Sequence, residues 1–215
     1  FDQMTAQLGG VWDTLLAEGR RFWITSTSDS HRNIDMGGAD FWPGQYSKTY
    51  VLARHDSADI FDGLRQGRMF AVTGDLIDTL DLQVETDGAA PATMGGTLQA
   101  TAGAQLTVRV SLTVPERANF NGDRNAIDHV DVIAGQATAD GAPEMTVHTV
   151  RAAQWRQTGN RIAFDLTLPA PETRGFVRVR GTSNAQIEPT PDVAGEDPWQ
   201  DLWFYSNPVF LELVR

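Results

Sequence analysis

The chain has 215 residues, with 17 Lys or Arg against 28 Asp or Glu, so its formal net charge is −11. This acidity argues against a general nucleic-acid binder, which needs a basic face. The absence of cysteine excludes disulfides, thiolate metal sites and cysteine nucleophiles. No apolar run reaches the ~18 residues that a membrane span needs.

The first third of the sequence has both helical and strand patterns. Apolar residues recur at helical spacing over Leu8–Ala17, and a second helix is expected with Ser57 as its N-cap and a stop at Gly67. Runs rich in β-branched and aromatic residues predict short strands at Arg21–Thr27, Thr49–Leu52 and Met69–Thr73. A long loop is expected over 32–48. Residues 1–75 are therefore predicted to have an α/β fold.

Period-two alternation dominates residues 76–215, which are predicted to form a separate antiparallel β-sandwich. The alternating runs are 79–84, 105–114, 127–133, 161–168, 175–180 and 209–214. The run 105–114 is expected to be a central strand whose inward side chains are Leu106, Val108, Val110, Leu112 and Val114. Arg178 and Arg180 alternate in the same way, and we expect them on the solvated face.

The most informative motif is Ser28-Asp29-Ser30-His31, at the end of the predicted strand Arg21–Thr27. An Asp and a His two residues apart on extended backbone point the same way. Their oxygen and nitrogen donors suit Zn, Mn or Fe, so Asp29 and His31 are candidate metal ligands. Hydrolytic metal centres usually take at least three protein ligands, and no His-x-His or His-Glu-x-x-His motif occurs. The alternative is a strand-end turn beside an exposed histidine.

The other polar candidates have weaker patterns. Arg32 and Lys48 are candidate charge partners for a substrate phosphate, although either is also compatible with a solvated loop. His55 precedes a helix and is expected at the surface. His129 and His148 lie in alternating runs and are expected to be structural.

Two further features have simple structural explanations. Asn119–Asn125 carries oxygen side chains at alternate positions, but its glycine is misplaced for an EF-hand and no suitable Glu follows, so a turn is expected. Trp42, Trp199 and Trp203 lie in irregular segments, where stacking on a sugar or base is one use. Sealing one domain against the other is the simpler use.

Five blocks resemble the polymerase-and-histidinol-phosphatase (PHP) superfamily of metal-dependent phosphoesterases, in its CehA/McbA-like branch. The block Trp23–His31 resembles the last metal-binding motif of the superfamily. The other four are Pro43–Val51, Gly63–Gly74, Gly175–Gly181 and Tyr205–Val209. The blocks occur in the expected order along most of the chain.

This resemblance implies that residues 1–75 are the last part of a distorted (β/α)7 barrel and that residues 76–215 are an accessory β-sandwich. It implies two or three divalent ions (Zn, Mn or Fe), with Asp29 bridging metals and His31 binding one of them. It also implies a small-molecule phosphoester substrate. The opening His-x-His and the middle ligands of the superfamily are missing, so an upstream barrel segment of the same protein is the expected partner.

Two functions remain open. One is the C-terminal part of a metal-dependent hydrolase that cleaves a phosphoester with a metal-activated water. The other is a non-catalytic β-sandwich binding or interaction module with a vestigial metal motif. A serine hydrolase is disfavoured because no Gly-x-Ser-x-Gly motif is present. The composition fits a cytoplasmic or a periplasmic protein equally.

Overall fold

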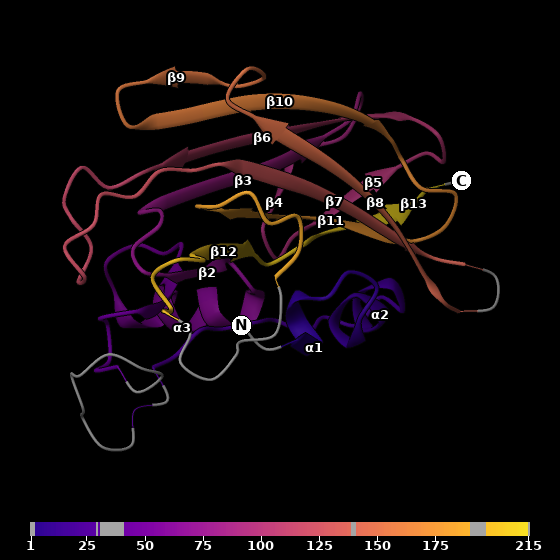
Figure 1. Cartoon of the computed structure of the whole chain (residues 1–215). Coiled ribbons are helices and arrows are strands. Elements are labelled where there is room, and N and C mark those ends of the chain that lie inside the picture. Colours follow the sequence, from indigo (N-terminus) through magenta and orange to yellow (C-terminus); the bar gives the residue numbers. More distant parts are fainter. Residues whose placement is uncertain (1–2, 29, 31–40, 139–140, 190–196, 215) are drawn as a thin grey trace.

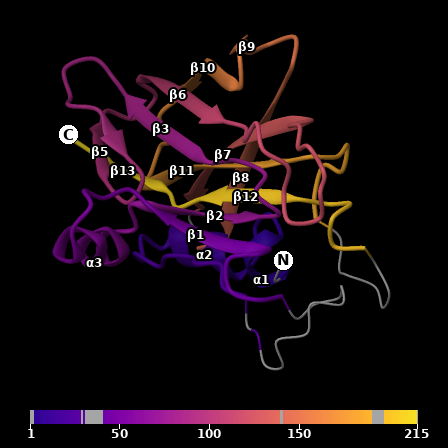
Figure 2. The same cartoon turned by 90° about the vertical axis from the view of Figure 1, so that its left-hand side faces the viewer.

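The computed structural model describes residues 3–28, 30, 41–138, 141–189 and 197–214. Two β-sheets are stacked face to face, and short helices lie beneath the lower sheet (Figure 1). A quarter turn of the view shows the same layers end-on, with the helices on one side only (Figure 2). Among the described residues, helices occur only before residue 67, and all later elements are strands.

One sheet has eight strands in the described residues, and segments from both ends of the chain build it. Along its path the order is β1-β2-β12-β11-β13-β5, with β7 paired to β11 and β8 paired to β7. The strands are β1 (Ser47–Val51), β2 (Met69–Thr73), β5 (Thr97–Ala100), β7 (His129–Ala137), β8 (Pro143–Arg151), β11 (Gly175–Thr182), β12 (Trp203–Ser206) and β13 (Val209–Leu213). All of these pairs are antiparallel except β13 with β5.

The second sheet has five strands in the described part of the chain, in the order β4-β3-β6-β10-β9. They are β3 (Thr79–Glu85), β4 (Ala92–Thr93), β6 (Gln105–Thr113), β9 (Arg156–Thr158) and β10 (Arg161–Pro169). The prediction that 105–114 is a central strand is confirmed, because β6 lies between β3 and β10. Four of its five predicted inward residues are fully buried, and Val114, just beyond the strand, packs partly against the same core.

The main core lies between the two sheets. Alternate residues of β3, β6 and β10 meet alternate residues of β2, β7 and β11 there, for example Leu82, Val110 and Phe164 against Val72 and Val179. These side chains are at most a few per cent exposed. Burial of this many aliphatic side chains, each contributing about 1.5–3 kcal/mol relative to exposure, is the main force that holds the sheets together.

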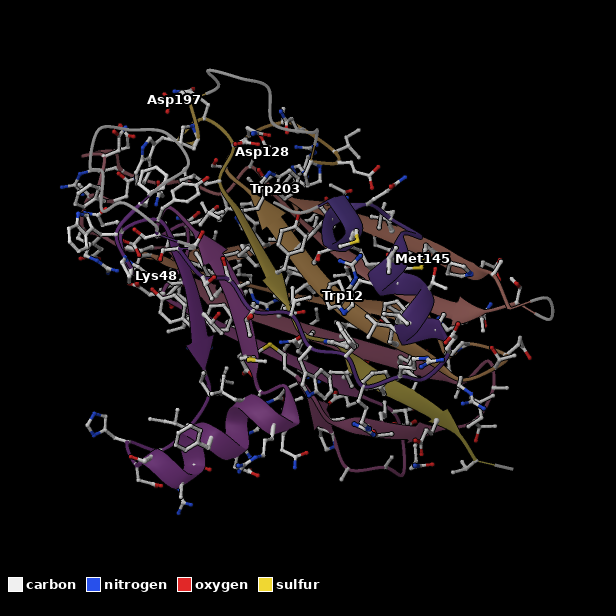
Figure 3. The ribbon with its side chains drawn as sticks, turned by 90° about the horizontal axis from the view of Figure 1, so that it is seen from below. Trp12, Lys48, Asp128, Met145, Asp197 and Trp203 are labelled. Carbon is white, nitrogen blue, oxygen red and sulfur yellow. The ribbon has the colours of Figure 1, made fainter. Side chains whose placement is uncertain are left out.

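Helices α1 (Gln3–Ala6) and α2 (Val11–Ala17) cover the outer face of the eight-stranded sheet (Figure 1). Trp12 and Leu16 of α2 pack on Phe176 of β11, and Ala6 of α1 packs on Trp203 of β12. Figure 3 shows Trp12 beside Met145 of β8, and Trp203 further along the same face. This face is therefore dry where the helices lie on it.

The expectation that Arg178 and Arg180 face solvent is wrong, since both are fully buried beneath α1 and α2. Arg178 makes two hydrogen bonds of 2.9 Å to the carboxylate of Asp13 in α2, and its guanidinium lies over the Trp12 ring. Arg180 donates to Asp131 of β7 and to the carbonyl of Ala6. Each buried cation thus has a buried carboxylate beside it, as burial of charge requires.

The predicted α/β fold of residues 1–75 is also wrong. β1 and β2 flank helix α3 (Ser57–Gln66), a pattern typical of a parallel crossover, but the two strands pair with each other antiparallel. β2 then pairs with β12, so this hairpin continues the large sheet, and the described residues contain no β/α barrel portion. The fold is all-β with three short helices in the described part. A domain boundary near residue 75 stays a prediction.

Two local differences complete the comparison with the predicted elements. The run Arg21–Thr27 is extended but has no ladder partner, so it is not a strand. Helix α3 is capped by Asp56, whose side chain accepts from the Asp59 amide, and not by Ser57 as expected; Gly67 ends the helix in the left-handed conformation as predicted. None of the helices in the described ranges is long and apolar enough to cross a membrane.

Candidate functional site

The backbone that leads to the Asp29–His31 motif runs along the large sheet without joining it. Two side chains supply the hydrogen bonds that a neighbouring strand would give. Asn207, between β12 and β13, accepts from the Ile24 amide (2.9 Å) and donates to the Ile24 carbonyl (3.2 Å). The Thr49 hydroxyl of β1 accepts from the Ser26 amide (2.8 Å) and donates to the Ser26 carbonyl (2.9 Å). Sequence reasoning missed both side chains.

Trp23 fixes the same segment at its beginning. Its indole nitrogen donates to the Arg65 carbonyl at the end of α3 (2.9 Å), and its ring meets Phe210 edge-on at 5.9 Å between centroids. The ring also lies against Gly67, where a Cβ atom would come within 2.5 Å of it. Gly67 therefore serves both the helix end, at φ +71°, and the close approach of Trp23.

The predicted ligands Asp29 and His31, and the predicted phosphate contact Arg32, lie outside the described residues. Their neighbours Ser28 and Ser30 are half-buried, and the Ser30 amide faces the Ser28 hydroxyl at 3.4 Å. The described residues contain no group of three or more His, Asp or Glu side chains placed to hold a metal ion. The donor types of Asp29 and His31 fit Zn, Mn or Fe, but two donors do not complete such a site.

Lys48 is described, and its ammonium is paired with the carboxylate of Asp75. Successive strand residues point to opposite faces, so Lys48 and Thr49 leave β1 on opposite sides, and only Thr49 contacts the segment that precedes the motif. Figure 3 shows Lys48 well away from Trp12 and Met145, which lie where the helices cover the sheet. A role for Lys48 in phosphate binding stays a prediction.

Asp75 is the centre of a charged cluster at the end of β2. Asp75 is buried, and its φ is +54°, a positive value that no other non-glycine residue has in the described part of the chain. Arg117 makes two hydrogen bonds of 2.8 Å to Asp78 and lies 3.8 Å from Asp75. Burial, followed by the nearby Asp75 and Asp78 carboxylates, raises the pKa of the Tyr50 hydroxyl. The charged side chains of the cluster pair with one another. Through Asp75 they connect Lys48 of β1 to Arg117 in the loop after β6.

The three remaining histidines differ in their exposure to solvent. His129 is fully buried in β7, with Nδ1 at 2.8 Å from the Asp128 carboxylate and its ring edge-on to Trp203. His148 is half-buried in β8, and His55 is exposed before α3. The hydrogen bond with His129, then that from Arg151, holds the pKa of Asp128 below its ordinary value.

The predicted turn at Asn119–Asn125 is confirmed, because the Asn119 side chain accepts from the Asp123 amide and Asn125 donates to the carbonyls of Gly74 and Asp75. The tryptophans differ among themselves. Trp203 is buried, whereas Trp42 is 42% exposed. Trp199 packs edge-on against Phe41 and Tyr46.

An open cavity of about 450 Å³ is lined by Gly19 and Arg21, which precede Trp23 in sequence, by Arg174, and by Phe210 and Glu212 of β13. Arg21 donates to the Gly95 carbonyl and to the Thr97 hydroxyl, so two of the five N–H donors of its guanidinium are used within the protein.

Two comparisons with known proteins returned nothing: no protein-family model matches the chain, and no curated protein matches it.

Proposed function

We propose that this chain supplies Asp29 and His31 to the metal site of a hydrolase that acts on a small-molecule phosphoester, and that the other metal ligands come from outside this sequence. A divalent ion bound by such a site supplies an activated water and neutralises charge on the phosphoryl oxygens. The chain's own part is to hold the last ligand pair on a rigid support.

The observation that carries this proposal is the spatial arrangement of the five blocks that resemble the PHP superfamily. Four of them contribute β1, β2, β12 and β11, which are four neighbouring strands in that order. The fifth block, which begins at Trp23 and contains the metal motif, is hydrogen-bonded to Thr49 and Asn207, and both of these belong to other blocks. The five-stranded sheet contains none of the blocks.

This arrangement favours the resemblance because chance similarity has no reason to select one continuous surface. Blocks that are distant in sequence meet as adjacent strands, since Tyr205 of β12 pairs with Ala71 of β2, and the segment that carries the motif lies against them. The support does not require a barrel within this chain. It requires a sheet to which Ile24 and Ser26 are attached.

The test is zinc binding by isothermal titration calorimetry on the chain and on four variants. Asp29→Ala and His31→Ala remove the proposed donors, while Asp87→Ala and His55→Ala remove a carboxylate and an imidazole from an exposed turn and an exposed loop. We expect weak binding that is lost in the first two variants and kept in the two controls. Equal binding in all five proteins would contradict the metal role and favour the alternative, a binding module with a vestigial motif.

A further inference from the structure

The contacts around Ile24 and Ser26 support an inference that rests on the proposed function and goes beyond it. We infer that Asn207 and Thr49 are positioning residues, whose side chains take the place of a neighbouring strand and fix the backbone that continues into Asp29 and His31. Neither residue is among the proposed ligands. Their role is exerted through the segment they hold.

Asn207 is suited to this role because its amide is fully used and fully buried. Its Oδ1 accepts from the Ile24 amide, and its Nδ2 donates to the carbonyls of Ile24 and Met69. Its own backbone amide also donates to the Met69 carbonyl, at 3.2 Å. One side chain therefore links the segment to Met69 at the start of β2 and satisfies both backbone polar groups of Ile24.

Thr49 repeats the arrangement two residues further along. Its hydroxyl accepts from the Ser26 amide and donates to the Ser26 carbonyl. Ile24 and Ser26 are separated by one residue, as are successive inward residues of a real strand, and both are half-buried while Thr25 between them is exposed. The segment thus has the hydrogen-bonding period of an edge strand although no backbone ladder holds it.

This substitution of side chains for a strand has a physical advantage. A backbone ladder would extend the sheet over the segment and continue pairing beyond it, whereas two point contacts hold Ile24 and Ser26 and leave the following residues to other partners. Groups that hydrogen-bond a metal ligand directly change metal affinity by about 10–100-fold when they are removed. Asn207 and Thr49 bond the backbone of Ile24 and Ser26 instead, so we expect a smaller effect on metal affinity in the same direction.

The experiment compares Thr49→Val, Thr49→Ser and Thr79→Val by amide hydrogen exchange. Valine keeps the shape and β propensity of threonine but removes the hydroxyl, and serine restores it. Thr79 is a matched control, since its hydroxyl bonds only the Thr113 side chain in the other sheet. We expect the Ser26 amide to exchange roughly fivefold or more faster in Thr49→Val, and near the wild-type rate in the other two. Unchanged exchange of Ser26 in Thr49→Val would overturn the inference.

Asn207→Asp gives an independent arm, because it replaces two donors by acceptors facing the Ile24 and Met69 carbonyls. We expect faster exchange at Ile24; if that variant does not fold, the Thr49 pair alone decides the inference. Zinc affinity separates the two proposals. A zinc affinity that is weaker in Thr49→Val and normal in Thr49→Ser supports the positioning role.

Two other outcomes are distinguishable. Zinc binding that disappears in Asp29→Ala but is unchanged in Thr49→Val overturns the positioning role and leaves the proposed metal function standing. A wild-type chain without zinc binding overturns the proposed function, and faster Ser26 exchange in Thr49→Val then still supports the mechanical part of the inference.

Discussion

Loss of the carboxylate of Asp13 should destabilise the protein more than most single changes. The Arg178–Asp13 pair joins α2 to the middle of the large sheet, and its side chains are 0% and 1% exposed. Asp13→Ala leaves the Arg178 guanidinium buried without its anion, which costs about 3–5 kcal/mol in comparable pairs. The change also removes the acceptor of the Gly9 amide. Since about 1 kcal/mol corresponds to about 2–4 °C in a domain of this size, the midpoint of thermal unfolding should fall by roughly 6–20 °C.

The assay is guanidinium unfolding followed by tryptophan fluorescence, because the Arg178 guanidinium lies 4.9 Å from the centroid of the Trp12 ring. Arg109→Ala is the control, since it breaks the solvent-exposed pairs of Arg109 with Glu85 and Asp165 and should cost less than about 1 kcal/mol. The double variant Asp13→Leu with Arg178→Met should recover much of the loss, as apolar replacements of buried pairs do. A loss below about 1 kcal/mol in Asp13→Ala would refute this account of the buried pair.

Three further predictions follow from the same structure. Gly95→Ala should destabilise the protein by about 1–3 kcal/mol more than Gly88→Ala in thermal unfolding. Both glycines have φ near +80°, but only at Gly95 would a Cβ atom meet backbone, at 1.8 Å from the Gln66 carbonyl oxygen. Equal losses of stability would contradict the close approach at Gly95. Asp128→Asn should reduce the loss of stability on acidification. A carboxyl whose pKa is lowered by folding stabilises the fold at pH values above its ordinary pKa of 3.8, and that contribution is lost as the pH falls through the lowered pKa. Unfolding midpoints that change with pH in parallel with those of the wild type would contradict this. The 215-residue chain with added Mn or Zn should hydrolyse chromogenic phosphomonoesters and phosphodiesters little or not at all, since Asp29 and His31 are too few ligands for a competent centre; robust hydrolysis that survives Asp29→Ala would mean that the active site lies elsewhere.

The β-sandwich was accessible from the sequence because alternation of apolar and polar residues survives in strands that have one wet face. In β6 every predicted inward residue is buried or packs against the core. The same logic failed for β11, where Arg178 and Arg180 lie under α1 and α2. A strand face that is covered by helices and a face exposed to water can both carry polar residues at every second position. The carboxylate that pairs with Arg178 lies 165 residues away in sequence, so the local pattern does not reveal it. A usable signal was Asp13, an acidic residue on the apolar side of a helix.

The α/β assignment failed for a different reason. A strand, a helix and a strand in sequence usually form a parallel unit, yet α3 here sits within an antiparallel connection between β1 and β2. The local pattern does not encode the direction of pairing, nor does it reveal that β12, from the far end of the chain, pairs with β2. For the candidate site, the donor types of Asp29 and His31 could be predicted from the sequence, but the contacts of Asn207 with Ile24 are recognisable only in three dimensions.

The most direct test of the central claim is a titration of the isotope-labelled chain with Mn²⁺, followed by paramagnetic broadening of its amide NMR signals. If Asp29 and His31 bind the metal, the signals of Ser28 and Ser30 should broaden first, and Asp29→Ala should remove the effect. Broadening that begins instead at the carboxylate cluster of Asp75 and Asp78, or that is unchanged in Asp29→Ala, would contradict the proposed metal site.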